Sequence, residues 1–177
     1  MPAVGAADVA DRAPVSIEPM TDADGPAVLD IYGQGIALGV ATFETVVPEW
    51  RAWTASHRRD CRFVARLDGR VVGWTALARY SSRDVYAGVA WESVYVDAAA
   101  RGRGVGAALL ATLIPASEAS GIWTLIAGVQ ANNPASLTLH ERAGFRRMGV
   151  QERIGRDATG TWRDVVLLER RSAIVAT

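Results

Sequence analysis

The 177-residue chain lacks several features that would point to a specialised class of protein. It has one cysteine, Cys61, which excludes an internal disulfide framework and any cysteine-rich metal site. Its 19 Lys and Arg residues balance 19 Asp and Glu residues, which argues against nucleic acid as the main partner. No apolar run approaches the roughly 20 residues that span a membrane. We therefore expect a soluble, cytoplasmic protein with no metal, no nucleic-acid partner and no membrane association.

The chain divides into one domain and two short tails. Residues 1–14 are rich in Ala and Asp and lack the basic start and apolar stretch of a signal peptide, so we expect a disordered N-terminal tail. Residues 15–170 carry the apolar patterns of a single folded domain, and residues 171–177 form a C-terminal tail. No repeat, low-complexity segment or internal linker interrupts the domain.

Turn and cap signals predict where strands and helices begin and end. Asp68-Gly69-Arg70 between two apolar runs signals a hairpin, Pro48 suits the first position of a helix, and Gly144 suits a helix C-cap. The expected strands are 15–19, 62–67, 71–78, 89–96, 123–129, 145–152 and 162–169. The expected helices are 21–38, 48–59, 104–120 and 133–143. The order β-α-α-β-β-β-α-β-α-β-β indicates a mixed α/β sheet in one domain.

The most informative segment joins strand 89–96 to the helix that follows it. Glu92 is the one acid in this apolar strand, and the loop Arg101-Gly102-Arg103-Gly104-Val105-Gly106 then opens a helix that continues with Ala107. Glycines let the backbone bend and let a ligand approach closely, and the N–H groups of a first helical turn have no internal partners. Helped by the helix dipole and two arginines, such a loop is suited to phosphate. The segment predicts a phosphate-bearing cofactor with a carboxylate near its reactive end.

The loop Arg101–Gly106 has other possible interpretations. A plain glycine-rich turn with solvated arginines is the simplest alternative. The loop is not a Walker loop, because no Gly-Lys-Ser/Thr follows it. It is a poor dinucleotide fingerprint, because the early βαβ context is missing.

Two separated motifs resemble the GNAT superfamily of acyl-CoA-dependent N-acetyltransferases. Arg101–Gly106 is similar to that superfamily's pyrophosphate loop. Asn133-Pro134-Ala135-Ser136, with Leu139-His140-Glu141 and Ala143-Gly144-Phe145, is similar to its helix and β-bulge region. The resemblance covers residues 15–170 and implies a GNAT-like mixed, mostly antiparallel sheet flanked by helices, with acetyl-CoA as co-substrate. It also implies that strand 89–96 splays from strand 123–129 and that the cofactor arm lies in the gap.

A narrower resemblance is to the phosphinothricin or methionine sulfoximine acetyltransferase branch. It rests on Glu92–Val96, Leu139–Glu141, Trp162–Val165 and Thr42-Phe43. The branch acetylates the α-amine of small amino-acid-like acids such as phosphinothricin, methionine sulfoximine or methionine sulfone, and the family is often dimeric. The resemblance thus implies a small amine acceptor and a homodimer. Trp91 and the loop 79–88 depart from the branch's pattern.

Acetyl transfer to an amine needs a base for the amine and a proton donor for the departing thiolate. Glu92, partly desolvated by apolar neighbours, is the candidate base, acting directly or through a water; an ion pair with an arginine is the alternative. His140 lies where many GNAT enzymes have a tyrosine that protonates the thiolate, and a packed, hydrogen-bonded histidine is the alternative. Tyr95 is a second candidate donor. His57 is expected to be solvated.

The resemblance also assigns residues to acetyl-CoA. Val94–Val96 would offer backbone groups to the pantetheine arm and an N–H to the thioester oxygen. Asn133, which also suits a helix N-cap, and Ser136 would touch the same arm. The predicted cofactor-binding residues are Val94, Tyr95, Val96, Arg101, Gly102, Arg103, Gly104, Val105, Gly106, Ala107, Asn133 and Ser136.

The predicted acceptor site consists of Phe43, Arg83, Tyr86 and Trp91. The guanidinium fork of an arginine suits a carboxylate or phosphinate, and aromatic side chains can wall a small pocket. The alternative is that the arginine is solvated and the aromatic residues pack an interface.

Three other functional interpretations complete the prediction. Cys61 could carry the acyl group in a ping-pong reaction, but no motif places a histidine beside it, so direct transfer in a ternary complex is preferred. A GNAT enzyme acting on a peptide amine or polyamine would show an open or acidic acceptor groove. A non-catalytic acyl-CoA-binding module would bind acetyl-CoA without turnover.

Overall fold

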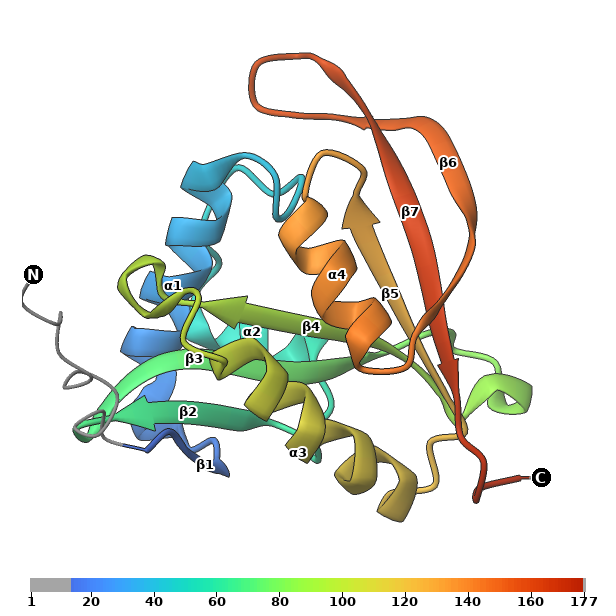
Figure 1. The fold of residues 1–177 in the computed structure, drawn as a ribbon, viewed down its shortest axis with the longest axis horizontal. Helices are drawn as coiled ribbons and strands as arrows, with labels where there is room; N and C mark the ends of the chain where they lie inside the picture. Colours follow the sequence, from blue (N-terminus) through green and yellow to red (C-terminus); the bar gives the residue numbers. More distant parts are fainter. Residues whose placement is uncertain (1–13, 177) are drawn as a thin grey trace, which may run out of the picture.

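A computed structural model describes residues 14–176, and it confirms the predicted order of strands and helices (Figure 1). The strands are β1 (Ser16–Pro19), β2 (Phe63–Leu67), β3 (Arg70–Arg79), β4 (Val89–Val96), β5 (Thr124–Gln130), β6 (Arg146–Arg156) and β7 (Trp162–Arg171). The helices are α1 (Gly25–Leu38), α2 (Trp50–Ser56), α3 (Val105–Ala119) and α4 (Pro134–Arg142). The N-terminal tail predicted for residues 1–14 lies outside the described residues except for its last one. The first residue of the predicted C-terminal tail, Arg171, belongs to β7.

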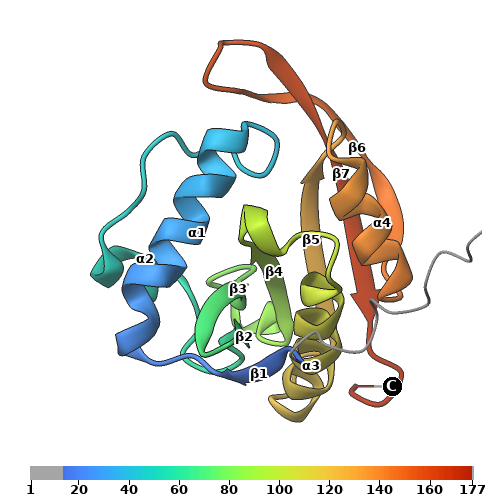
Figure 2. The same cartoon turned by 60° about the vertical axis from the view of Figure 1, so that its left-hand side comes forward.

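The strands form one sheet in the order β1-β2-β3-β4-β5-β7-β6. Every neighbouring pair is antiparallel except β4 and β5, which run parallel. Helices α1 and α2 cover one face, and α3 and α4 cover the other (Figure 2). This is the expected mixed, mostly antiparallel sheet flanked by helices.

The hairpin between β2 and β3 forms where its turn residues predict. Asp68 and Gly69 both have positive φ, 49° and 75°, which is the backbone of a type I′ turn. Aspartate tolerates this region and glycine adopts it freely, so the two residues fix the register of the pair. Gly144 ends α4 with φ of 86°, as its predicted C-cap role requires.

The second helix is shorter than predicted. It begins at Trp50 instead of Pro48, because Glu49 is extended, and it ends at Ser56 instead of near residue 59. The side chain of Arg62 donates to the carbonyls of Thr54 and His57, both at 2.7 Å, and so satisfies carbonyl groups at this C-terminus. The prediction that His57 is solvated is also wrong, because its ring stacks on Trp53 with centroids 4.1 Å apart.

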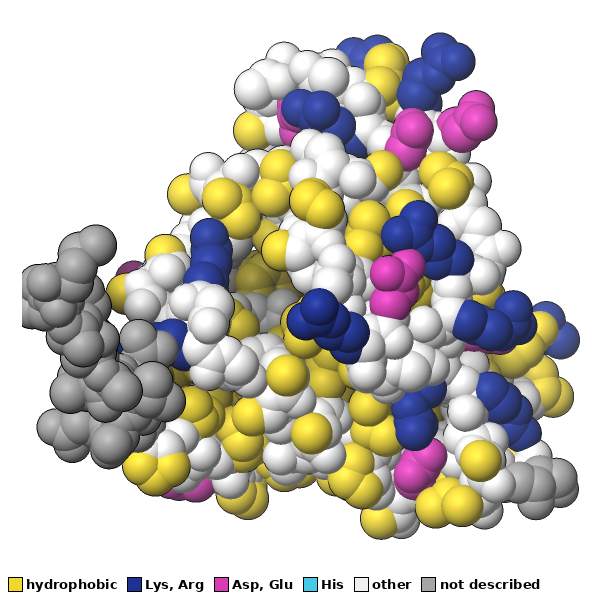
Figure 3. Space-filling model, viewed as in Figure 1, with side chains coloured by type: hydrophobic (Ala, Val, Ile, Leu, Met, Phe, Trp, Pro, Cys, Tyr) yellow, Lys and Arg dark blue, Asp and Glu magenta, His cyan; other side chains and the backbone are white. Residues whose placement is uncertain are grey.

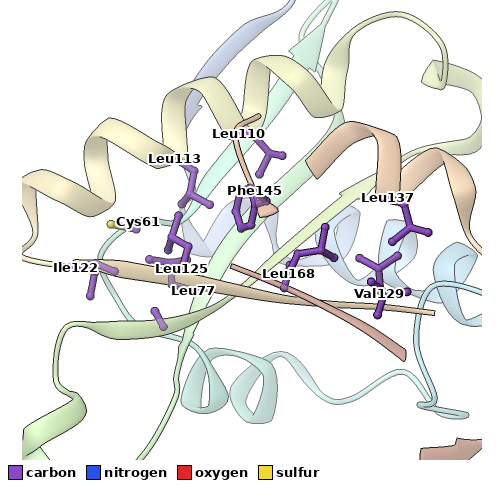
Figure 4. Packing of buried hydrophobic residues seen from close by; sticks show 13 residues of the cluster. Cys61, Leu77, Leu110, Leu113, Ile122, Leu125, Val129, Leu137, Phe145 and Leu168 are labelled. Carbon is purple, nitrogen blue, oxygen red and sulfur yellow. The ribbon is translucent and has the colours of Figure 1, made fainter. Parts of the chain in front are cut away.

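Both faces of the sheet are buried under helices, which fixes the direction of each β4 side chain. Val28, Ile31, Trp53 and Trp74 pack together on the α1–α2 face. On the opposite face, side chains of α3 and α4 pack against β5 and β7. The members of this cluster include Leu110, Leu113, Leu125, Leu137, Phe145 and Leu168 (Figure 4). Along β4, Ala90 and Val94 join this second cluster while Tyr95 joins the first, so Glu92 faces α3 and α4.

Among residues 14–176, no helix combines the length and the hydrophobicity needed to cross a bilayer. Within the same range, no three His, Cys, Asp or Glu side chains gather as a metal site would require.

Candidate active site

A cleft opens where β4 and β5 separate. The two strands pair only over Val89–Trp91, opposite Thr124–Ile126, although β4 stays paired with β3 as far as Val96. Past Trp91 the edges of β4 and β5 that face one another are unpaired, and a cleft of about 880 Å³ lies there. Figure 3 shows the surface hollowed near its centre, with hydrophobic side chains deep in the hollow. The splay implied by the sequence resemblance is therefore present.

The glycine-rich loop forms one wall of this cleft. Gly102 and Gly104 have φ of 70° and 80°, a region that costs side-chain-bearing residues free energy, and Gly104 is the N-cap of α3. The first helical hydrogen bond joins Ala108 N to Gly104 O at 3.0 Å, so the N–H groups of residues 105–107 precede it and have no helical partner. Together with the helix dipole they form an anion-binding end.

The cleft brings together nearly all the residues predicted to bind the cofactor or to act in catalysis. Arg103 is the exception: it is exposed and does not line the cleft, whereas Arg101 does. The predicted residues that line it are Glu92, Val94, Tyr95, Val96, Arg101, Gly102, Gly104, Val105, Gly106, Ala107, Asn133, Ser136 and His140.

Glu92 and His140 form a buried pair at the point where β4 leaves β5. Glu92 Oε2 lies 2.8 Å from His140 Nε2, and the two side chains are 1% and 3% exposed. Glu92 therefore pairs with His140 and not with an arginine, which was the alternative. His140 is held by its position on α4, where its ring also packs edge-on against Phe145 with centroids 5.2 Å apart. Glu92 on β4 and His140 on α4 are thus both placed at the cleft by regular secondary structure.

The hydrogen bonds of His140 determine where its protons lie. Nδ1 is 2.7 Å from the carbonyl oxygen of Ser136, which can only accept, so Nδ1 carries a proton. The contact between Nε2 and Oε2 then requires one more proton between ring and carboxylate. Burial opposes a charged ring, but the Glu92 carboxylate outweighs it and raises the pKa of His140. The contact with Glu92 therefore favours the protonated ring of His140.

The second carboxylate oxygen of Glu92 has no donor. Glu92 Oε1 is buried and lacks a hydrogen-bond partner among the described residues. A buried acceptor without a donor costs free energy, which a donor supplied by a ligand would offset. The pair therefore has one oxygen bound to His140 and one available to accept a proton.

A segment after α1 is tied to the cleft by three side chains that hold consecutive carbonyl groups. Asn133 Nδ2 donates to Val40 O at 3.2 Å, Tyr95 Oη to Ala41 O at 3.3 Å, and Gln130 Nε2 to Thr42 O at 3.1 Å. Asn133 also accepts from Ser136 N at 3.1 Å, so it caps α4 as predicted. Sequence reasoning missed Gln130, whose only signal was an amide at the end of an otherwise apolar strand. These bonds fix the segment 40–42 over the cleft.

Tyr95 is poorly placed to act as a proton donor. Its side chain lies on the α1–α2 face, with Ser93 and opposite Glu92, as alternation along a strand predicts. Its ring stacks on Trp74 with centroids 4.6 Å apart, and burial raises the pKa of its hydroxyl. Of the two candidate donors, His140 is the one beside Glu92.

The predicted acceptor residues do not converge in this cleft. Arg83 lies over the ring of Tyr86 at 5.4 Å, and Tyr80 bridges Tyr86 and Trp91 with centroids 5.7 Å from each. None of them lines the cleft. Phe43 lies apart from this cluster, close to Gly155 on β6.

Cys61 is a core residue. It is buried, its sulfur lies 3.5 Å from Ser120 Oγ, and burial raises the pKa of its thiol. A raised pKa lowers the fraction of thiolate, which is the nucleophilic form. This environment supports the preference for direct transfer over an acyl-cysteine.

Comparisons with known proteins agree with this geometry. The Acetyltransferase (GNAT) family model matches residues 35–145. The chain is 34% identical to a phosphinothricin N-acetyltransferase of Alcaligenes faecalis, over 90% of this chain and 83% of that protein. It is 31% identical to an L-methionine sulfoximine/L-methionine sulfone acetyltransferase of Pseudomonas paraeruginosa, over 83% of this chain and 88% of that protein.

A solved structure shares the fold. The crystal structure of a GNAT superfamily phosphinothricin acetyltransferase from Sinorhizobium meliloti, in complex with acetyl-CoA, matches with a TM-score of 0.83 and 26% identity. The match covers 92% of this chain and 90% of that one. The similarity therefore extends over nearly the whole of both chains.

The pKa values of the two histidines should be shifted in opposite directions from the ordinary value. The carboxylate of Glu92 raises the pKa of His140, whereas burial, helped by Arg62, lowers the pKa of His57. NMR titration should find one imidazole above and one below about 6.5, the ordinary value. Glu92→Gln should lower the pKa of His140 and leave that of His57 in place. Two histidines that both titrate normally would contradict the buried pair.

The same shift has a defined effect on stability. A histidine whose pKa is raised by folding stabilises the protein below its unfolded pKa of about 6.5, and this contribution falls as pH rises through the raised folded pKa. Urea unfolding can be measured for the natural protein and for His140→Gln across this pH range. The difference between their unfolding free energies should become smaller as the pH rises.

Proposed function

This chain belongs to the GNAT acetyltransferase family and is an acetyl-CoA-dependent N-acetyltransferase, and we propose that it acetylates the primary amine of a small amino-acid-like acceptor by direct transfer in a ternary complex. Phosphinothricin, methionine sulfoximine and methionine sulfone are the acceptor types that its relatives' names give. The observation that carries the proposal is the buried Glu92–His140 pair, which lies in the cleft that also holds the anion-binding loop.

The loop and the splayed strand are assigned to acetyl-CoA. The N–H groups at the start of α3 and the side chain of Arg101 would hold the pyrophosphate, because they combine unpaired donors with positive charge. The unpaired edge of β4 from Val94 to Val96 offers backbone groups to the pantetheine arm. A relative with the same fold binds acetyl-CoA, which supports this assignment.

The Glu92–His140 pair is assigned to proton transfer. Glu92 accepts a proton from the attacking amine through Oε1, directly or through a water, while the charged ring of His140 stabilises the carboxylate through Oε2. As the new C–N bond forms and the C–S bond breaks, the pair returns one proton to the departing sulfur. The amine loses one proton and CoA leaves as a thiol, so the pair ends each cycle as it began.

The acceptor side of the site is assigned to the surroundings of Trp91 and Phe43. Trp91 lies close to Gly128, which lines the cleft, and Phe43 follows the segment 40–42 that is tied to cleft side chains. Both remain in the proposed acceptor site. Arg83 and Tyr86, which pack on one another and join Trp91 through Tyr80, complete the proposed acceptor site.

The proposal includes a homodimer. Large hydrophobic side chains are exposed on the edge hairpin formed by β6 and β7, namely Met148, Val150, Ile154 and Trp162. An exposed apolar edge strand is a surface that soluble proteins commonly cover by association.

A thiol-release assay with acetyl-CoA tests the acceptor class. The panel contains phosphinothricin, methionine sulfoximine, methionine sulfone, common amino acids and polyamines. We expect release with members of the first group and none with polyamines. Activity confined to polyamines or peptide amines would contradict the proposed acceptor, and binding of acetyl-CoA without release for any amine would favour a non-catalytic module.

The anion-binding loop is tested by Gly104→Asp. The substitution adds a negative charge near the proposed pyrophosphate and forces a side chain into φ of 80°, so KM for acetyl-CoA should rise by roughly tenfold or more. Gly160→Asp is the matched control, because Gly160 has φ of 81° in the exposed β6–β7 turn. Equal KM values for acetyl-CoA in the two variants would contradict the assignment of this loop to the pyrophosphate.

A further inference from the structure

A second cavity lies behind β4, on the face covered by α1 and α2. Its volume is about 310 Å³, at the lower end for sites that bind small molecules. Its walls come from α1, α2, β3, β4 and the segment between the two helices. The ring-bearing residues that line it are Tyr32, Trp53, His57, Trp74 and Tyr95. We call it the aromatic cavity.

The rings of the aromatic cavity are held by one another. Trp74 stacks on Tyr95 and meets Trp53 edge-on, with centroids 4.6 and 5.3 Å apart. The ring of His57 stacks on Trp53, which is the edge-on neighbour of Trp74. Trp53 and Trp74 are 2% and 1% exposed, so neither can move without disturbing the core. The cavity is therefore a formed site with flat apolar walls.

The aromatic cavity adjoins the acetyl-CoA cleft. Ser93 and Tyr95 line both, so this stretch of β4 is their common wall. The segment after α1 also borders both, with Val40 and Ala41 at the cleft and Glu44 at the cavity. A small molecule whose side chain occupies the cavity therefore has its other end beside the strand assigned to acetyl-CoA.

The charge of the cavity is negative. Among the described residues that line it, Glu44 is the one carboxylate and is exposed at the rim, and none is an arginine or lysine. Burial raises the pKa values of Tyr32 and Tyr95, and the Glu44 carboxylate adds to both shifts, so its field reaches both rings. Burial lowers the pKa of His57, which keeps that ring neutral. Arg62 lies over the Trp53 ring at 5.4 Å, but it is outside the lining and its guanidinium donates to backbone carbonyls.

Two walls of the cavity contain unused hydrogen-bond donors. The indole nitrogens of Trp53 and Trp74 are buried and have no partner among the described residues. These two donors are shielded from the cavity, whereas a neutral ligand oxygen, such as that of a sulfone or sulfoximine, can enter it without bringing a charge toward Glu44.

We propose that the aromatic cavity receives the side chain of the acceptor and selects an uncharged side chain, such as a sulfone, sulfoximine or aromatic group, over an anionic one. This inference rests on the proposed function and narrows it. Methionine sulfone and methionine sulfoximine satisfy the requirement. Phosphinothricin does not, because its phosphinate would lie in a cavity with a carboxylate and no cation.

The first experiment measures kcat/KM for methionine sulfone and for phosphinothricin. The natural protein should prefer methionine sulfone by roughly tenfold or more, and Glu44→Gln should reduce that ratio by about fivefold, because it removes the repulsion of the phosphinate. Glu49→Gln, an exposed carboxylate outside the cavity on the same segment, should keep the natural ratio. A natural protein that prefers phosphinothricin, or a ratio unchanged by Glu44→Gln, would overturn the proposal.

The second experiment blocks the cavity. Ala52 is exposed and lines it, whereas Ala55 is exposed on the same helix and does not. Ala52→Phe should raise KM for methionine sulfone by about tenfold and leave KM for acetyl-CoA unchanged, and Ala55→Phe should change neither. Equal KM values for methionine sulfone in the two variants would contradict occupancy of the cavity.

Tryptophan fluorescence separates a failure of the cavity from a failure of the proposed function. Absence of thiol release with every acceptor would refute the function. In that case, saturable quenching by methionine sulfone that Ala52→Phe abolishes would still support the cavity as its binding site, since two tryptophans form its walls. No quenching in the natural protein would overturn the cavity proposal.

Discussion

The structure depends on the early end of the parallel pairing between β4 and β5. The two strands share three residue pairs, the last joining Trp91 to Ile126, and then separate while each stays paired on its other side. A sheet that opens in its middle must leave backbone groups unpaired, and such groups need a ligand or water. The cleft, the unpaired edge of β4 and the position of Glu92, one residue past the last pair, all follow from this separation.

The opening is held by polar contacts that reach across it. Helix α4 brings His140 against Glu92, and its N-cap Asn133 holds the segment after α1. Tyr95 on β4 and Gln130 on β5 hold the next two carbonyl groups of that segment. The segment 40–44 thus borders both the acetyl-CoA cleft and the aromatic cavity, and the two adjoin at Ser93 and Tyr95 of β4.

Local signals in the sequence predicted local structure well. The Asp68-Gly69 turn, the Asn133 cap and the Gly104 helix start each depend on a few neighbouring residues, and all three form. The pairing of Glu92 with His140 joins residues 48 apart, so no local pattern could reveal it. The sequence predicts a solvated His57, yet the rings of Trp53 and Trp74 pack against it. The aromatic cavity escaped prediction for the same reason, since its walls come from five separate parts of the chain.

We propose that Glu92 and His140 act as one proton-transfer unit, and a double-mutant cycle in kcat measures whether they do. Glu92→Gln and His140→Gln should each lower kcat by roughly a hundredfold or more while KM for acetyl-CoA stays near its natural value. The double variant should be no slower than the slower single variant, because either substitution already disables the pair. Losses that multiply in the double variant would contradict the claim, since they would mean that the two residues act independently.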